Sequence, residues 1–113
     1  MKYKPPFSSG WTVYILECAD KSYFVGITRN LRRTVADMNV LRKNIYFSKH
    51  PERVPAVAAF EEKRLKFREA YAKWQYLREM NRLQRRNLIR TKRWPIGGAL
   101  LDYILKAPIE ELE

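Results

Sequence analysis

The stretch Trp11-Thr12-Val13-Tyr14-Ile15-Leu16-Glu17, followed closely by Tyr23-Phe24-Val25-Gly26-Ile27-Thr28, decides the fold of this chain. Both runs are rich in aromatic and β-branched residues, a composition that is typical of β-strands. The polar connection 19–22 is short enough to join two antiparallel neighbours. The sequence therefore predicts a β-hairpin. Residues 1–10 precede it, and their prolines, serines and glycine favour turns and indicate a flexible arm.

A helix is predicted directly after the hairpin. Leu31, Val35 and Met38 recur at spacings of four and three, which places them on one helical face. Asn30 stands before them, where its side chain can cap the first turn. We therefore expect a helix from Asn30 to about Leu41.

The second half of the chain predicts one more strand and two helices. The apolar run 54–60 has strand character, and Pro55 places its start at an edge or outside the ladder. From residue 62 to residue 93 there is no Gly or Pro, and the composition favours helix. Asn81 and Gln84 have the spacing of a capping box, so we expect this stretch to divide into two helices there.

Together these elements predict an α+β fold in residues 11–93. We expect a short antiparallel or mixed three-stranded sheet flanked by helices, which suits the length of 113 residues. Residues 94–113 form a predicted C-terminal extension with a short apolar helix at 99–106 and an acidic end. Two roles stay open for that helix: packing on its own domain, or acting as a docking or dimer element.

The charge of the chain favours an acidic partner. There are 23 Lys and Arg residues against 12 Asp and Glu residues, a net charge of +11, and such a field attracts polyanions. Cys18 is the single cysteine, so no intramolecular disulfide forms, and we expect a buried, inert thiol in a reducing, cytoplasmic setting. No apolar run is long enough for a membrane span, and no signal peptide is recognisable. His50 stands alone in a polar loop, and no metal site or cofactor is expected.

A stripe of arginines is predicted on the last long helix. Its members share helical spacings of four, four and three, which places them along one face; they are Arg82, Arg86, Arg90 and Arg93, with Arg85 at the flank. Further cations that extend the surface are Arg29, Arg32 and Arg33, with Lys2, Lys4, Arg42, Lys43 and Lys49. Like charges crowded on a helix destabilise it, so an anionic partner explains them better than a solvated face.

The hairpin and the helix after it resemble the GIY-YIG nuclease domain. Residues 12–14 (TVY) stand at the position of the GIY triplet, and residues 24–26 (FVG) at that of YIG. The resemblance covers about residues 11–90. It implies a small α+β domain and, for active members, metal-assisted hydrolysis of a phosphodiester. That reaction uses two tyrosines, an arginine, often a histidine, and a glutamate that holds the metal.

Of the residues that the resemblance implies, one is retained. Tyr14 matches the first tyrosine, whereas Phe24 replaces the second and lacks its hydroxyl. Thr34 stands at the arginine position, Met38 at the histidine and Trp74 at the glutamate. We expect Phe24, Met38 and Trp74 to fill the former cleft with apolar surface, which makes the protein a pseudoenzyme.

The sequence thus predicts a non-catalytic module that binds DNA or RNA on a nuclease scaffold. One alternative is a protein-interaction module, for instance an inhibitor or assembly subunit, whose basic face binds an acidic protein. The other is a divergent metal-dependent endonuclease.

Overall fold

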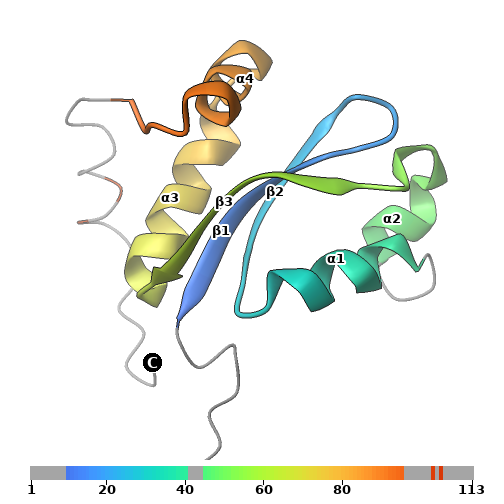
Figure 1. Cartoon of the computed structure of the whole chain (residues 1–113), viewed down its shortest axis with the longest axis horizontal. Helices are drawn as coiled ribbons and strands as arrows, with labels where there is room; N and C mark the ends of the chain where they lie inside the picture. The colour runs from blue at the N-terminus through green and yellow to red at the C-terminus, as the bar shows by residue number, and fades with distance from the viewer. Residues whose placement is uncertain (1–9, 41–44, 96–102, 104, 106–113) are drawn as a thin grey trace, which may run out of the picture.

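The computed structural model describes residues 10–40 and 45–95, together with residues 103 and 105. The fold is α+β, as predicted (Figure 1). Strands β1 (Trp11–Glu17), β2 (Tyr23–Thr28) and β3 (Val57–Leu65) form one antiparallel sheet in the order β2-β1-β3. The helices are α1 (Leu31–Asn39), α2 (Ile45–Lys49), the 3₁₀ helix η2 (Pro51–Arg53), α3 (Phe67–Glu79) and α4 (Arg82–Thr91).

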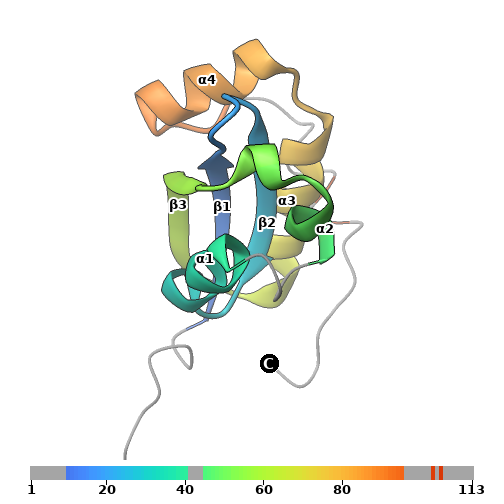
Figure 2. The same cartoon turned by 90° about the vertical axis from the view of Figure 1, so that its right-hand side faces the viewer.

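Helices cover both faces of the sheet. α1 and α2 lie on one face, and α3 and α4 lie on the other (Figures 1 and 2). Central strand β1 is buried on both sides because its successive side chains point to opposite faces. Val13 and Ile15 face α3, whereas Tyr14 and Leu16 face α1.

Two apolar clusters result, one on each face. The α3 cluster contains Val13, Ile15, Phe60, Leu65, Ala70, Leu77, Met80 and Leu88. The α1 cluster contains Tyr14, Leu16, Cys18, Met38, Phe47 and Ala56. The sheet therefore separates two independent packing environments. The cluster to which a residue belongs shows on which face of the sheet its side chain packs.

The local signals at the helix ends are confirmed. The Asn30 side chain accepts a hydrogen bond from the backbone N–H of Arg33 and so caps α1, which ends at Asn39. Asn39 then holds the chain before β3, because its amide both accepts from the N–H of Ala56 at 2.8 Å and donates to its carbonyl at 3.0 Å. The capping box of Asn81 and Gln84 is also present, and it separates α3 from α4.

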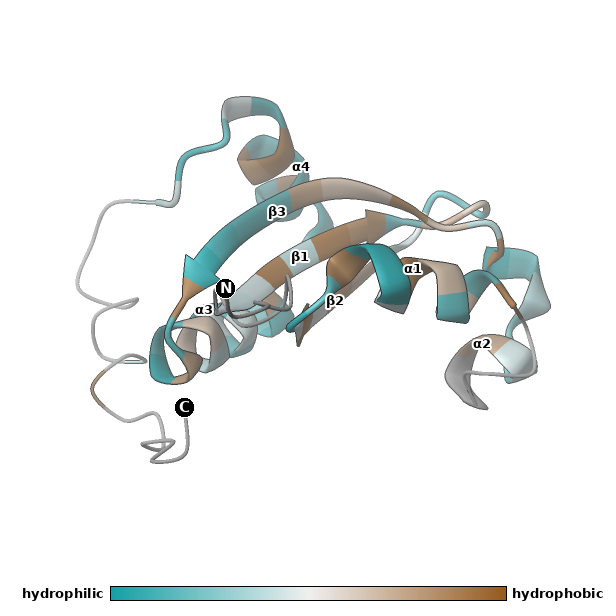
Figure 3. Ribbon diagram, turned by 60° about the horizontal axis from the view of Figure 1, so that its bottom comes forward, coloured by the Kyte–Doolittle hydropathy of each residue, from teal (hydrophilic) through white to brown (hydrophobic). Residues whose placement is uncertain are grey.

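The third strand differs from its prediction. It was expected at 54–60, with helix from about residue 62, but β3 runs from Val57 to Leu65. The composition of residues 61–65 favours helix, yet their pairing with β1 decides their conformation. This half of β3 is hydrophilic (Figure 3), as suits an edge strand with one solvated side.

A polar network ties the end of the described chain to the sheet. Lys73, which is only 7% exposed, donates to Glu62 Oε1 at 2.8 Å and lies 3.1 Å from Glu69 Oε2. The Trp94 indole N–H donates to the same Glu62 oxygen at 2.8 Å. Because the buried ammonium has two carboxylate partners, the network stabilises the fold and fixes Trp94 over α3.

Several predictions lie outside the described residues. These are the N-terminal arm with Lys2 and Lys4, the cations Arg42 and Lys43, and the C-terminal helix at 99–106 apart from Tyr103 and Leu105. Within the described ranges, no helix has the length and apolar character needed to cross a membrane.

Candidate nucleic-acid interface

Tyr14, the one residue that matches the site implied by the resemblance, is buried in the α1 cluster with 2% of its surface exposed. Its hydroxyl lies over Gly26 of the neighbouring strand, at the point where the two residues pair. Burial raises the pKa of Tyr14 to about 12, since the phenolate would lose its hydration. Tyr14 therefore stays protonated at neutral pH and serves as a core residue.

The positions around Tyr14 hold apolar side chains and a hydrogen-bonded threonine. Met38 is buried in the same cluster, and Phe24 packs against it with its ring 5.2 Å from that of Phe47. Thr34 uses its hydroxyl in a 2.6 Å hydrogen bond with the hydroxyl of Thr28. Apolar side chains and a local hydrogen bond thus stand where the resemblance implies a water-activating pair and a phosphate-binding arginine.

The prediction for Trp74 was wrong. Trp74 packs on the α3 cluster, on the opposite face of the sheet from Tyr14, Phe24 and Met38. It therefore cannot help to fill their cleft.

The residues present do not fit the divalent metal that the resemblance implies. Glu61 is the cross-strand partner of Tyr14, but its carboxylate lies 3.8 Å from the Lys63 ammonium. Within residues 10–40 and 45–95, no three Asp, Glu, His or Cys side chains gather closely enough to hold a metal ion. A single carboxylate that is already paired with a cation is a poor ligand set for such an ion.

A basic groove lies on this face of the sheet, between α1 and β3. Its volume is about 660 Å³, and Thr12 of β1 lines it between the two elements. Four cationic side chains line the groove and will be called the groove cations: Arg29, Arg32, Lys63 and Arg64. Glu61 is the acidic residue in the lining, so the described lining carries a net charge of +3.

A β-bulge brings two of the groove cations together. Trp11 pairs with Leu65 and Val13 pairs with Glu62, so β3 holds one residue more than β1 in this interval. In a regular strand Lys63 and Arg64 would point to opposite faces, but both line the groove. Arg64 accommodates the extra residue by adopting a left-handed backbone conformation with a φ of 63°. For a residue other than glycine, this conformation costs about 1 kcal/mol or more relative to the extended conformation of a strand.

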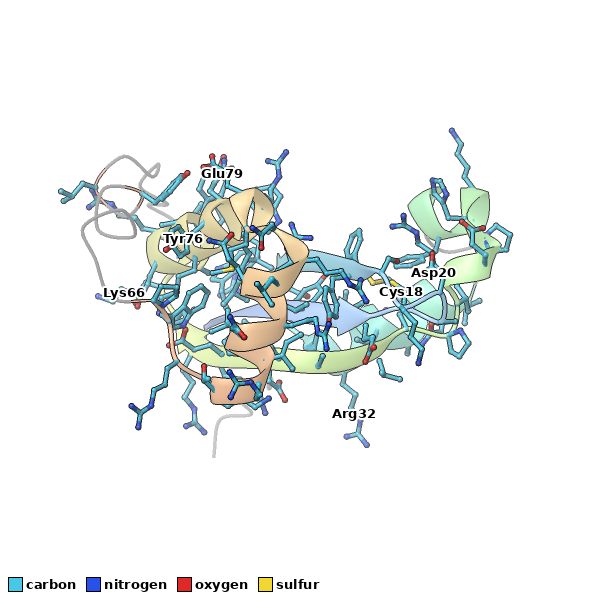
Figure 4. The ribbon with its side chains drawn as sticks, turned by 90° about the horizontal axis from the view of Figure 1, so that it is seen from above. Cys18, Asp20, Arg32, Lys66, Tyr76 and Glu79 are labelled. Atoms are coloured by element: carbon cyan, nitrogen blue, oxygen red, sulfur yellow. The ribbon has the colours of Figure 1, made fainter. Side chains whose placement is uncertain are left out.

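The other two groove cations flank the start of α1. Arg29 places its guanidinium 5.3 Å from the centroid of the Trp11 ring. Arg32 reaches outward from the first turn of α1 (Figure 4). The N-terminus of a helix carries a partial positive charge, so the α1 backbone adds to the potential of these side chains.

The predicted arginine stripe on α4 is only partly present. Arg82 donates to the carbonyl of Lys21 and lies over the Tyr23 ring at 5.1 Å. Arg93 lies beyond the helix, because α4 ends at Thr91 and Lys92 forms a left-handed C-cap. Arg86 and Arg90 remain exposed on the helix, on the face of the sheet opposite the groove.

Arg85 has a structural role instead of the predicted binding role. Its Nε and one terminal nitrogen donate to the carbonyl of Leu77, at 3.1 and 3.0 Å, and a weaker bond reaches the carbonyl of Arg78. These carbonyls belong to the last turn of α3, where the Leu77 carbonyl also accepts from the backbone N–H of Met80 at 3.2 Å. Burial lowers the pKa of Arg85, which is the direction expected for a cation turned inward.

The remaining candidates are accounted for locally. Arg33 is exposed and lies 4.0 Å from Asp37, a pair that contributes little to stability. Lys49 is exposed at the end of α2, and His50 lies 3.4 Å from Glu52. Cys18 is buried, as predicted, and burial raises the pKa of its thiol.

Three groove residues escaped the sequence-based prediction. Lys63 and Arg64 fell in the stretch predicted as helix, Glu61 fell between the predicted strand and that helix, and none of the three was named as a binding residue. Gly10 was taken as part of a flexible arm, yet a side chain there would lie 2.9 Å from the carbonyl oxygen of Leu65. The one signal for the bulge is that Phe60 and Leu65 stand five positions apart, and it is not visible without knowing that both residues are core.

Comparisons with protein-family models, with curated protein sequences and with solved structures each found no match to this chain.

Proposed function

We propose that this protein is a non-catalytic module that binds nucleic acid through the basic groove between α1 and β3. The observation that carries the proposal is the gathering of the four groove cations around a single carboxylate, in a groove of about 660 Å³. Lys and Arg side chains neutralise phosphates and release the counterions condensed on a nucleic acid, which drives binding.

The geometry of the groove supports a phosphate ligand in particular. Arg29 and Arg32 come from the start of α1, whereas Lys63 and Arg64 come from the bulge of β3, so cations stand on both walls. A backbone lying in the groove would be contacted from two sides. Such contacts position a nucleic acid without selecting its sequence, so binding is expected to be weakly sequence-selective.

The non-catalytic part of the proposal depends on the residues around Tyr14. A nuclease needs a base or an activated water, a positive group at the phosphate and a carboxylate that holds the metal. Here the phenol has a raised pKa, Thr34 is bonded to Thr28, and Glu61 is paired with Lys63. The groove keeps the means to bind phosphate beside a site that lacks the means to cleave it.

The test is a salt-dependent titration of two charge-reversed variants with labelled duplex and single-stranded oligonucleotides. The groove variant carries Arg32→Glu and Arg64→Glu. The matched control carries Arg86→Glu and Arg90→Glu on α4, and it has the same net charge. Loss of two phosphate contacts should flatten the slope of log affinity against log salt by about 1.8 for duplex DNA, at roughly 0.9 per contact.

The groove variant should show this change, whereas the α4 control should lose less affinity and keep the wild-type slope. A loss confined to the α4 control would move the interface to the opposite face of the sheet. If the wild-type protein binds neither form at low salt, the proposal is wrong and an acidic protein becomes the better partner.

A further inference from the structure

A row of aromatic rings follows one side of α3 and meets an arginine at each end. In order, the aromatic row consists of Arg29, Trp11, Phe67, Tyr71, Trp74 and Arg78. Successive ring centroids lie 5.1, 5.8 and 5.4 Å apart. The two guanidinium groups lie 5.3 and 5.0 Å from the centroids of the end rings.

The sequence of α3 builds this row beside the core and not within it. Phe67, Tyr71, Trp74 and Arg78 follow spacings of four, three and four, so they share one helical face. The residues that α3 buries deepest, such as Ala70 and Leu77, stand on another face. All four rings of the row keep part of their surface exposed. Trp11 and Trp74 also pack against the α3 cluster, so the row combines partial packing on the core with surface that stays exposed.

We propose that the aromatic row stacks the bases of a single-stranded nucleic acid that continues out of the basic groove. This inference rests on the proposed function and names its substrate class. Every nucleobase has a π-face that stacks on an aromatic ring or on a guanidinium plane, so such a row binds bases of any sequence. In a duplex the base faces are covered by their neighbours, and the rings then have nothing to stack on.

Arg29 connects the two surfaces. Its guanidinium lies over the Trp11 ring, which begins the row, and its side chain also lines the groove. Trp11 is the first residue of β1 and pairs with Leu65, the residue after Arg64. The phosphate-binding and base-stacking surfaces therefore meet at one end of the sheet. A single strand that leaves the groove there reaches the first ring directly.

The charge along the row fits the same ligand. Arg78 closes the far end over Trp74, and Arg82 follows over the Tyr23 ring at 5.1 Å. Cations that stand at both ends of a row of aromatic rings combine phosphate attraction with stacking, the two contributions that sequence-tolerant single-strand binders use.

The experiment compares Tyr71→Ala with Tyr71→Phe. Titrate each variant and the wild type with a fluorescein-labelled oligo(dT) and with a labelled duplex, following anisotropy at several salt concentrations. Tyr71→Ala should weaken single-strand binding by roughly five- to 150-fold, the equivalent of one stacked base. Tyr71→Phe keeps the ring and should bind as the wild type does. Duplex affinity should not change, and neither should the salt slope, because no phosphate contact is removed.

The outcomes separate this inference from the proposed function. If Tyr71→Ala is folded by circular dichroism and binds single strands as tightly as the wild type, the aromatic row is not the stacking surface. The groove variant Arg32→Glu/Arg64→Glu would still lose affinity in that case, and the proposed function would stand. If the wild type binds neither ligand at low salt, both fail. If Tyr71→Ala does not fold, Arg78→Ala tests the far end of the row. This variant should also lose more affinity for the single strand than for the duplex.

Discussion

The Tyr14 hydroxyl occupies the space that a side chain at Gly26 would need. A Cβ atom built on Gly26 would lie 2.7 Å from Cζ of the Tyr14 ring, closer than carbon atoms approach one another in proteins. The two residues are direct cross-strand partners, so neither backbone can move away without disturbing the hairpin. Gly26 is the last residue of the FVG triplet at residues 24–26. A glycine is needed there for a steric reason, because the Tyr14 side chain leaves no room for a Cβ atom.

Gly26→Ala should destabilise the fold by about 1–3 kcal/mol, because the added methyl overpacks a buried contact. Chemical denaturation of the variant and the wild type measures the difference. Adding Tyr14→Phe should recover part of the loss, since the hydroxyl is one of the atoms in conflict. Equal effects of Gly26→Ala in both backgrounds would show that the phenol is not the source of the cost.

The raised pKa of Tyr14 should make the protein lose stability in alkaline solution. Between the ordinary value of 10.0 and about 12, the unfolded chain has released this proton and the folded chain has not. The free energy of unfolding then falls by about 1.4 kcal/mol per pH unit. The contribution is fully present below pH 10 and is lost towards pH 12, a total of roughly 3 kcal/mol.

Other groups titrate in the same range, so the comparison must be with Tyr14→Phe. Urea denaturation at pH 9 and at pH 11.5 gives the change in the free energy of unfolding between the two pH values for each protein. This free energy should fall further for the wild type than for Tyr14→Phe. Parallel losses would mean that the phenol ionises freely in the folded protein.

Arg85 and Arg86 are neighbours in sequence, but replacing Arg85 should destabilise the fold and replacing Arg86 should not. Arg85→Ala removes the guanidinium bonds to the Leu77 carbonyl, which keeps its bond from the Met80 N–H, and should cost about 0.5–1.5 kcal/mol of stability. Arg86→Ala changes an exposed position and should stay within about 0.5 kcal/mol of the wild type. Thermal or chemical denaturation measures both. Neither variant should change the affinity for nucleic acid. If Arg86→Ala alone lowered this affinity, α4 would be implicated in binding.

We expect no nuclease activity. Plasmid, single-stranded DNA and RNA incubated with the protein and Mg²⁺ or Mn²⁺ should stay intact, with an active metal-dependent nuclease as the positive control. Installing Phe24→Tyr and Thr34→Arg together should not create activity, because Glu61 remains paired with Lys63 and no further carboxylate joins it. Metal-dependent cleavage that disappears in Tyr14→Phe would contradict the pseudoenzyme proposal.

Local signals in the sequence were enough for much of the fold. The hairpin runs, the Asn30 cap and the capping box at Asn81 each depend on residues within a few positions of one another. The length of β3 could not be predicted in that way, because residues 61–65 favour helix and become strand only through pairing with distant β1. With that strand misplaced, Lys63 and Arg64 could not be recognised as partners of Arg29 and Arg32.

Helical spacing also could not show which way an arginine turns. Arg85 and Arg86 both suit an exposed basic helix, yet only the packing of α4 against the end of α3 brings Arg85 to the Leu77 carbonyl. For Trp74, a large aromatic side chain could be recognised from the sequence, but the face of the sheet on which it packs could not.

The bulge in β3 separates the evolution of the groove from that of the core. Phe60 and Leu65 both face the α3 cluster although an odd number of positions separates them, and the extra residue restores the alternation beyond it. Lys63 and Arg64 thus stand opposite a single residue of β1, and both lie on the outer side of a strand whose inner side is already complete. Substitutions in this pair can retune the affinity or ligand of the groove while every buried contact of β3 stays as it is.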